Sequence, residues 1–279
     1  MQSDHFKNNH LKQHHLKHCH SKRRAFLGVM AAGLAGALLL PLRTLAAMWN
    51  KAAFDAEKLD TAQKSLEING EIISKDIQIT APDRAENGAI VQVEIIANIP
   101  NIEAIAIFVE KNPTPLIANI MFGAGAAAKL TTRIKMAETS DIKVVVSAGG
   151  KYFTAKKQVQ VVENGCGGGG SGLEKFETSM KLRAKLKNNT TEIKAIIIHP
   201  MHTGRGKDDF DKIIAAHFIQ LIDITHNNKP ALQMQCGTGI AKNPYLTCYV
   251  DNAKVGDKIN LTWHDNLGNT STGEVVVTA

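Results

Sequence analysis

The sequence predicts an all-β protein of two immunoglobulin-like β-sandwich domains, with a short N-terminal helical segment before the first. Short runs rich in Val and Ile follow one another along the chain, and turn signals such as Asn112-Pro113 and Gly149-Gly150 separate them. Consecutive glycines at 167–170 interrupt this pattern once and divide the 279-residue chain into two series of strands. Each series has the number of short strands that a small sandwich needs.

The first series opens with a helix. Apolar residues recur at helix-like spacing among charged ones between residues 48 and 68, and Gly70 lies just past the expected end. The strands expected after it are Ile77–Thr80, Ile90–Ala97, Ala104–Glu110, Leu116–Phe122, Thr131–Met136, Ile142–Ser147 and Tyr152–Val162.

The second series starts after the glycines. Its expected strands are Met180–Leu186, Thr191–His199, His217–His226, Ala231–Cys236, Tyr245–Val250, Lys258–His264 and Gly273–Thr278. The expected divisions are a leader at 1–47, a first sandwich with its helix at 48–163, a glycine-rich arm and linker at 164–179, and a second sandwich at 180–279. Composition predicts a flexible linker with a typical span of ~20 Å over 167–179, and we expect the sandwiches to pack on each other.

The formal charge of +7 does not indicate a nucleic-acid-binding protein. Seven Lys and Arg residues stand against Asp4 in residues 1–47, so the leader carries +6 of that charge and the rest of the chain +1. The basic surface that a nucleic-acid binder needs is therefore not predicted for the sandwiches.

The leader is typical of a twin-arginine export signal. Arg23 and Arg24 precede Phe26-Leu27 and an apolar run, rich in Ala and Gly, that ends at Leu40; Ala46-Ala47 suits a cleavage site. The run is shorter than the ~20 residues of a spanning helix, which disfavours an uncleaved membrane anchor. Export predicts a periplasmic protein that is not attached to the membrane after processing.

Cys166 is the residue with the clearest chemical role. Gly165 precedes it and Gly167 and Gly168 follow, so we expect a thiol that no neighbouring side chain shields, on a backbone free to turn. No His or Arg stands nearby in the sequence to lower its pKa, which suits presentation to other proteins better than catalysis. If the first sandwich ends near Val162, the arm can carry Cys166 at most ~14 Å away. The alternative is an idle linker cysteine, although an exposed free thiol is a liability in an oxidising compartment.

The other cysteines and the histidines carry less information. Cys19 lies in the leader. Cys236 and Cys248 flank a turn-like stretch, where they can form a disulfide across a hairpin or be two small buried side chains. The histidines of the second half match no standard zinc or copper spacing. We therefore expect turn and strand-edge histidines, with His199-Pro200 opening a loop, and neither a metal site nor a cofactor.

Several segments resemble the sulfur-oxidation subunits SoxY and SoxZ. Asn164-Gly165-Cys166-Gly167-Gly168 looks like the C-terminal Gly-Gly-Cys-Gly-Gly arm of SoxY. The segments that resemble the SoxY core, in the same order, are Ile79–Asp83, Ala85–Gly88, Asn98–Asn101, Val109–Pro113 and Thr132–Met136. Those that resemble SoxZ are His199–Met201, Ala216–Ile219, Lys242–Leu246 and Trp263–Asn266. The chain departs from the family at Asn164, where a glycine is usual, at His202, where a glutamate is expected, and in closing the arm into a tether.

The resemblance implies a non-catalytic sulfur carrier. In that family the arm cysteine carries sulfur intermediates, so it implies that Cys166 is the point of covalent attachment. It also implies three partner enzymes, which supply the catalysis. These are a c-type cytochrome complex that loads thiosulfate oxidatively, a hydrolase that releases sulfate, and a molybdenum–heme sulfane dehydrogenase. Both subunits of the family are immunoglobulin-like.

Three other functions compete with this one. A fused carrier can instead serve a quinoprotein dehydrogenase system. A metal or redox protein would use the histidines and cysteines of the second half, and metal analysis would reveal it. A structural or adhesive β protein predicts that Cys166→Ser changes nothing. An exposed Cys166 also predicts that two molecules can join through a Cys166–Cys166 disulfide when no cargo is bound.

Overall fold

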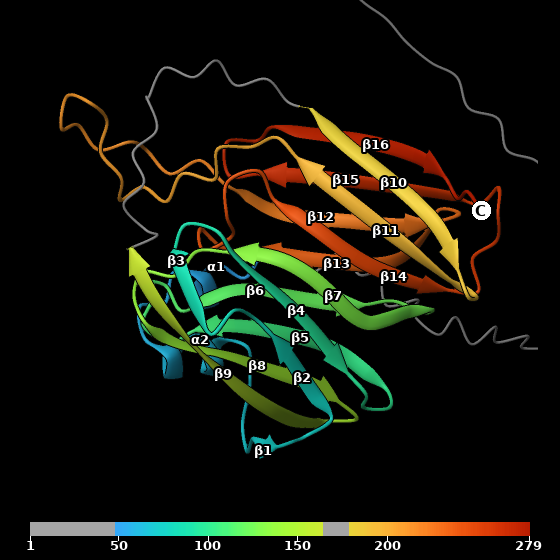
Figure 1. The fold of residues 1–279 in the computed structure, drawn as a ribbon, viewed down its shortest axis with the longest axis horizontal. Coiled ribbons are helices and arrows are strands. Elements are labelled where there is room, and N and C mark those ends of the chain that lie inside the picture. The colour runs from blue at the N-terminus through green and yellow to red at the C-terminus, as the bar shows by residue number, and fades with distance from the viewer. Residues whose placement is uncertain (1–47, 164–178) are drawn as a thin grey trace, which may run out of the picture. The chain divides into compact units, whose positions relative to one another are not determined.

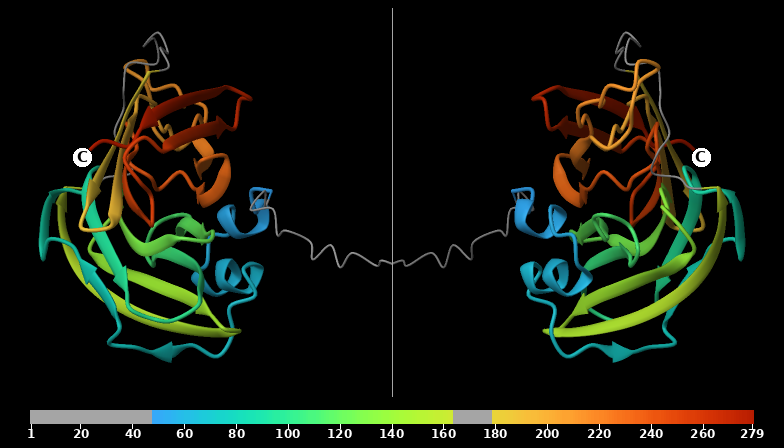
Figure 2. Two further views of the ribbon diagram at one scale, coloured as in Figure 1. Left: turned by 90° about the vertical axis from the view of Figure 1, so that its right-hand side faces the viewer. Right: turned by 90° about the vertical axis from the view of Figure 1, so that its left-hand side faces the viewer.

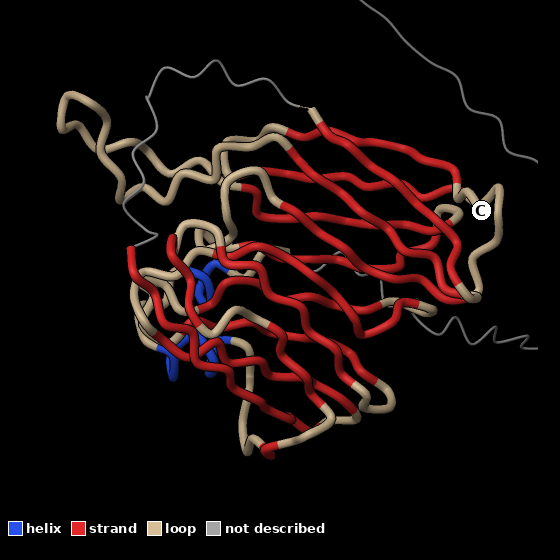
Figure 3. The backbone as a smooth tube through the Cα atoms, in the orientation of Figure 1, coloured by secondary structure: helices blue, strands red, loops and turns tan. Residues whose placement is uncertain are grey.

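The structure, a computed structural model, describes residues 48–163 and 179–279, which belong to one compact unit. Strands dominate these residues and helices are few, so the predicted all-β fold class is confirmed (Figure 3). In the described part of the chain, no helix has the length and apolar character that crossing a membrane requires.

The first half contains all the strands expected from its sequence, together with two short ones, β1 and β3. The strands between residues 48 and 163 are β1 (Ile72–Ile73), β2 (Ile77–Thr80), β3 (Arg84–Asn87), β4 (Val91–Ala97), β5 (Ile102–Val109), β6 (Leu116–Phe122), β7 (Ala126–Ile134), β8 (Ser140–Ala148) and β9 (Lys151–Glu163). Both additional strands pair in parallel with β9. They are mostly exposed, so they lack the apolar alternation by which a strand is recognised.

The second half contains the strands expected from its sequence. They are β10 (Met180–Lys187), β11 (Thr190–Ile197), β12 (Ile219–His226), β13 (Lys229–Cys236), β14 (Tyr245–Asp251), β15 (Lys258–Asp265) and β16 (Thr270–Val276).

The helical segment before the first sandwich is present but interrupted. It forms α1 (Lys51–Phe54) and α2 (Leu59–Ser65), and Lys58 between them is extended. The segment ends before Gly70, because Glu67 takes a left-handed conformation with φ 58°. The break lets both helices bury apolar residues against the outer face of β5, β6 and β8 (Figure 2).

Two sheets run through both halves (Figure 1). One has the strand order β1-β9-β8-β5-β6-β13-β12-β15-β16, with β3 attached to β9, and the other has the order β10-β11-β14-β7-β4-β2. The halves meet edge to edge in each sheet, because β6 pairs with β13 and β7 with β14, both antiparallel. The expectation that the two sandwiches pack on each other is confirmed, and the pairing covers edges that would otherwise be open.

One hydrophobic core lies between the sheets and includes side chains of both halves. Ile107 and Leu130 contribute from the first half, and Leu261 and Trp263 from the second, all essentially inaccessible to solvent. Because the core is shared, the stability of each half depends on the other.

The segment 237–244 passes from one sheet to the other. A side chain at Gly237 would meet the carbonyl oxygen of Leu116 at 2.8 Å, so only glycine fits this crossing. Cys236 ends β13 in the ten-stranded sheet, whereas Cys248 lies in β14 of the six-stranded sheet. The two cysteines are thus in different sheets and are not cross-strand neighbours in a hairpin. Both are free and buried. The expectation of a disulfide across a hairpin is thus wrong, and the alternative of two small buried side chains is confirmed.

Candidate functional site

The predicted site residues, Cys166, Gly165, Gly167 and Gly168, lie outside the described residues. What the structure defines is where the segment 164–178 leaves the fold and where it returns. These two points are Glu163 at the end of β9 and Ser179 before β10.

Glu163 is held on the first half by backbone hydrogen bonds. It is in register with Asn87 of β3, and its carbonyl oxygen accepts from Gly88 N at 2.9 Å. The carbonyl oxygen of Gly88 accepts in turn from Met136 N at 2.7 Å. Two separate parts of the first half, residues 87–88 and Met136, thus support Glu163.

Ser179 is held beside a long connection of the second half, residues 198–218, which joins β11 to β12. Its carbonyl oxygen accepts from Ile198 N at 2.8 Å. The same connection also touches the first half, because the buried ammonium of Lys135 donates to the carbonyl oxygens of Met201 and, at 3.0 Å, Thr238. Lys135 is next to Met136 in the sequence, and Met136 supports Glu163 through Gly88. Glu163 and Ser179 are therefore both linked to the first residues of the 198–218 connection.

The two described cysteines are unsuited to carrying a substrate. Burial raises the pKa of the Cys248 thiol to about 12 and raises the pKa of the Cys236 thiol further still. Both side chains lie within the core between the sheets. Neither is a thiolate at neutral pH, and no partner protein can reach them. Cys166 is the remaining cysteine of the chain after the leader.

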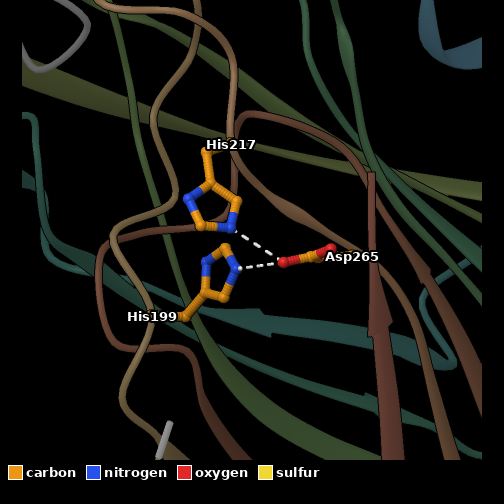
Figure 4. A group of neighbouring side chains, drawn as sticks. All are labelled: His199, His217 and Asp265. Carbon is orange, nitrogen blue, oxygen red and sulfur yellow. Dashed lines mark hydrogen bonds and ion pairs between the residues drawn. The ribbon is translucent and has the colours of Figure 1, made fainter. Parts of the chain in front are cut away.

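The structure brings together three side chains that the sequence does not group. His199, His217 and Asp265 offer ligand atoms that all lie within 4.8 Å of one another (Figure 4). His217 Nε2 lies 2.8 Å from Asp265 Oδ2, and His199 Nε2 lies 3.4 Å from the same oxygen. His199 lies at the start of the 198–218 connection, His217 lies near its end, and Asp265 ends β15.

The hydrogen bonds of this cluster favour a structural role over metal binding. His199 Nδ1 accepts from Met201 N at 3.1 Å, which places the imidazole proton on Nε2, the nitrogen that faces Asp265. A metal at Nε2 would need that proton removed. Asp265 Oδ2 also accepts from Asn269 Nδ2, and Oδ1 accepts from the backbone N–H of Leu267 and Asn269. The carboxylate is therefore already saturated with donors.

The ionisation of the cluster follows from its burial and its hydrogen bonds. Burial, together with the neighbouring His217, lowers the pKa of His199 to about 4, although Asp265 opposes this shift. Burial alone would raise the pKa of Asp265, but the hydrogen bonds from Asn269, His217 and the backbone lower it to about 2. At neutral pH a neutral His199 thus faces a charged carboxylate. The cluster ties both ends of the 198–218 connection to β15.

An open cavity of about 380 Å³ lies beside this connection. Trp49 and Phe54 of the first half line one part, and Arg205, Phe218 and Thr238 of the second half line another. Trp49 also donates from Nε1 to the carbonyl oxygen of Cys236 at 2.9 Å. The N-terminal segment therefore helps to join the halves near the same end of the molecule.

Sequence reasoning missed the cluster for a definite reason. His199 and Asp265 are 66 positions apart, and no spacing rule connects a loop histidine with an aspartate at the end of another strand. The usable signal was Asp265, a carboxylate at the end of the apolar strand that contains Trp263. A carboxylate at a buried strand end needs hydrogen-bond donors, so such a residue indicates that donors lie nearby.

Comparison with known proteins finds separate matches for the two halves. Residues 64–166 match the family described as Sulfur oxidation protein SoxY, and residues 180–276 match Sulphur oxidation protein SoxZ. A solved structure of the sulfur carrier protein SoxY from Chlorobium limicola f thiosulfatophilum is 35% identical and covers 37% of this chain and 93% of its own, with a TM-score of 0.34. A superoxide reductase (neelaredoxin) from Ignicoccus hospitalis is 15% identical and covers 30% of this chain and 79% of its own, with a TM-score of 0.27. No curated protein matches the chain.

Proposed function

Because this chain belongs to the SoxY and SoxZ families of sulfur oxidation proteins, fused in one polypeptide, we propose that it holds sulfur intermediates covalently on Cys166 and presents them to partner enzymes. The protein acts as a substrate carrier and leaves catalysis to those partners. The carrier arm comprises Gly165, Cys166, Gly167 and Gly168.

The observation that carries this proposal is the position of Cys166 among the cysteines. The match to the SoxY family ends on Cys166. Cys236 and Cys248 are buried with raised pKa values, so they do not compete for the role. Cys166 is also only three residues beyond Glu163, where the backbone is held by hydrogen bonds.

The proposed loading step is an oxidative conjugation. The Cys166 thiol and thiosulfate, S2O3²⁻, form R–S–S–SO3⁻ and release one proton and two electrons, which a c-type cytochrome complex accepts. Water then attacks the terminal sulfur on a hydrolase, leaving R–S–S⁻ on the carrier and releasing sulfate and two protons. A molybdenum–heme sulfane dehydrogenase oxidises the remaining sulfane sulfur. The carrier supplies only the sulfur atom and its accessibility.

The proposed location is the periplasm, reached through the twin-arginine leader with cleavage near Ala46 or Ala47. This route would carry the folded pair of sandwiches across together. Replacing Arg23 and Arg24 with Lys should leave the full-length precursor inside the cell, as cell fractionation with an antibody would show. Normal export of that double variant would exclude this route.

A related carrier function has one specific feature in its favour. The arm here is followed by the second sandwich, whereas in the family it usually ends at a free C-terminus. Such a carrier can serve a quinoprotein dehydrogenase system with different docking demands. The two alternatives are separated by which oxidising system consumes the loaded protein.

Intact-mass spectrometry tests the covalent step. Mature protein incubated with thiosulfate and the cytochrome complex should gain the mass of one S2O3 group, and a reductant should remove it. Cys166→Ser is the matched variant, which should gain nothing. An adduct of equal yield on Cys166→Ser would refute attachment at this residue.

A further inference from the structure

The connection between β11 and β12 presents two exposed apolar side chains on a hydrogen-bonded turn. Within residues 206–214, here called the 206–214 hairpin, Lys207 pairs with Ile213 and Ile214 N donates to the carbonyl oxygen of Gly206 at 2.9 Å. Phe210 is 86% exposed and Ile213 is 65% exposed. Both therefore face solvent on a short segment that projects from the sheets (Figure 3).

The hairpin is held in shape by its own polar groups. Asp208 Oδ1 accepts from Phe210 N at 3.0 Å and from Lys212 N at 2.9 Å. Asp208 N donates to the carbonyl oxygen of Lys212 at 2.9 Å, and Lys207 pairs with Asp211 at 2.7 Å. These bonds order the tip before any partner arrives, so a partner that binds it loses little conformational entropy.

Folding does not account for the two apolar side chains. Neither Phe210 nor Ile213 belongs to the hydrophobic cores of the described residues. An aromatic residue on an ordered, exposed turn costs solubility and adds little stability, whereas aromatic anchors are frequent at the centres of protein interfaces.

The hairpin lies at the end of the molecule where the arm is fixed. Its base is closed by backbone hydrogen bonds between His202 and His217, at 2.7 and 3.1 Å. Ile198 and Met201 come just before that base. Ile198 N donates to the carbonyl oxygen of Ser179, and the carbonyl oxygen of Met201 accepts from Lys135. Met136, next to Lys135, supports Glu163 through Gly88. Chain geometry keeps Cys166 within ~10 Å of Glu163, at ~3.5 Å for each residue. A protein that encloses Cys166 must therefore approach this end.

We propose that the 206–214 hairpin docks the thiosulfate-loading cytochrome complex that acts on Cys166, with Phe210 and Ile213 entering an apolar socket beside the entrance to its active site. The inference rests on the proposed carrier function and deepens it. The arm then delivers the sulfur, and the hairpin supplies binding that does not depend on the cargo. Charges of both signs surround the tip, with Lys207 and Asp211 paired to each other, so the apolar side chains are what distinguish it.

Steady-state kinetics with the thiosulfate-loading cytochrome complex tests this inference. The double variant Phe210→Ser with Ile213→Ser should raise the KM for the carrier about tenfold, as loss of an interface anchor does, and leave kcat at saturating carrier unchanged. The matched control is Ile73→Ser, which removes an 87% exposed apolar side chain from β1, the outermost strand of the first half. It should keep the wild-type KM. The thermal midpoint of the double variant should also stay at the wild-type value.

Four outcomes would overturn the inference. These are a wild-type KM for the double variant, an equal rise in KM for Ile73→Ser, a lowered thermal midpoint that makes the hairpin a structural element, and a wild-type dimer that the double variant converts to monomer in sedimentation. Cys166→Ser in the same assay separates this inference from the proposed function. If Cys166→Ser still turns over, the carrier function fails; if only the hairpin variant behaves as wild type, docking alone fails.

Discussion

At the scale of single residues, the three cysteines after the leader divide by environment. Cys236 and Cys248 are buried, and burial raises the pKa of each thiol, to about 12 for Cys248. Cys166 stands between glycines in the sequence, three positions after Glu163, whose backbone is held by hydrogen bonds. We expect a thiol reagent under native conditions to modify Cys166 at least about a hundredfold faster than the other two, since the thiolate reacts and burial hides it.

Intact-mass spectrometry during the labelling reaction checks this expectation. Wild-type protein should gain one label quickly, and Cys166→Ser should gain none until denaturant is added. Unloaded wild-type protein should also form a Cys166–Cys166 dimer under mild oxidation, whereas cargo on the sulfur should block it. Rapid labelling of Cys166→Ser would show that a buried cysteine is reachable.

The buried histidine predicts how stability changes with pH. The pKa of His199 is about 4 in the folded protein and near 6.5 when unfolded, so the unfolded chain binds this proton more readily between those values. Stability should therefore fall as pH drops from about 6.5 to 4, by up to about 3 kcal/mol from this group. The lowered pKa of Asp265 adds a second loss between about pH 4 and 2.

Urea unfolding at a series of pH values measures this dependence. His199→Gln should flatten the slope between pH 6.5 and 4, whereas replacing the exposed His264 with Gln should preserve it. An unchanged slope in His199→Gln would mean that another group carries the dependence. The cluster of His199, His217 and Asp265 was not predicted from the sequence, because its members come from the ends of separate elements.

At the scale of elements, alternation of apolar and polar residues was enough to place most strands. The runs now seen as β4, β9 and β15 have clear apolar positions, and the structure has strands there. β1 and β3 carry no such pattern, since they are exposed pieces that only complete the edge of β9. The break between α1 and α2 was not predicted for a similar reason. Spacing predicts which face is apolar, but tertiary packing decides where the helix breaks.

We predict that the N-terminal segment stabilises the association of the two halves. Trp49 stacks on Phe54 with ring centroids 5.2 Å apart, lies 5.8 Å from Phe218, and donates to the carbonyl oxygen of Cys236. Trp49→Ala should lower the free energy of unfolding by about 2–3 kcal/mol, less than for a fully buried tryptophan. Trp49→Phe, which keeps the stacking, should cost only about 1 kcal/mol for the lost hydrogen bond. Equal effects of the two substitutions would contradict the role given to stacking.

At the scale of the whole molecule, the halves are joined by paired strands and a shared core. β6 and β13 pair from Leu232 to Cys236, and β7 pairs with β14 in the other sheet. A protease site inserted between Gly172 and Thr178 allows the tether to be cut. The two fragments should then stay together on gel filtration, because strand pairing and core burial do not need the covalent link. Separation of the fragments without denaturant would contradict this.

The shared sheets explain what the sequence could and could not predict at this scale. Two strand series separated by glycines indicated two sandwiches, and their resemblance to two subunits indicated that they associate. The mode of association depends on which edge strands remain unpaired in each half, and no local pattern in β6 or β13 reveals that.

The central claim is that Cys166 carries the substrate, and reconstituted sulfur oxidation tests it most directly. Thiosulfate-dependent electron release would be measured with the complete set of partner enzymes, using wild-type protein and Cys166→Ser at equal concentration. A serine hydroxyl cannot form the sulfur–sulfur bond, so the variant should lose turnover while it keeps the wild-type thermal midpoint. Equal rates for the two proteins would mean that Cys166 is a linker residue and that the sulfur is carried elsewhere or not at all.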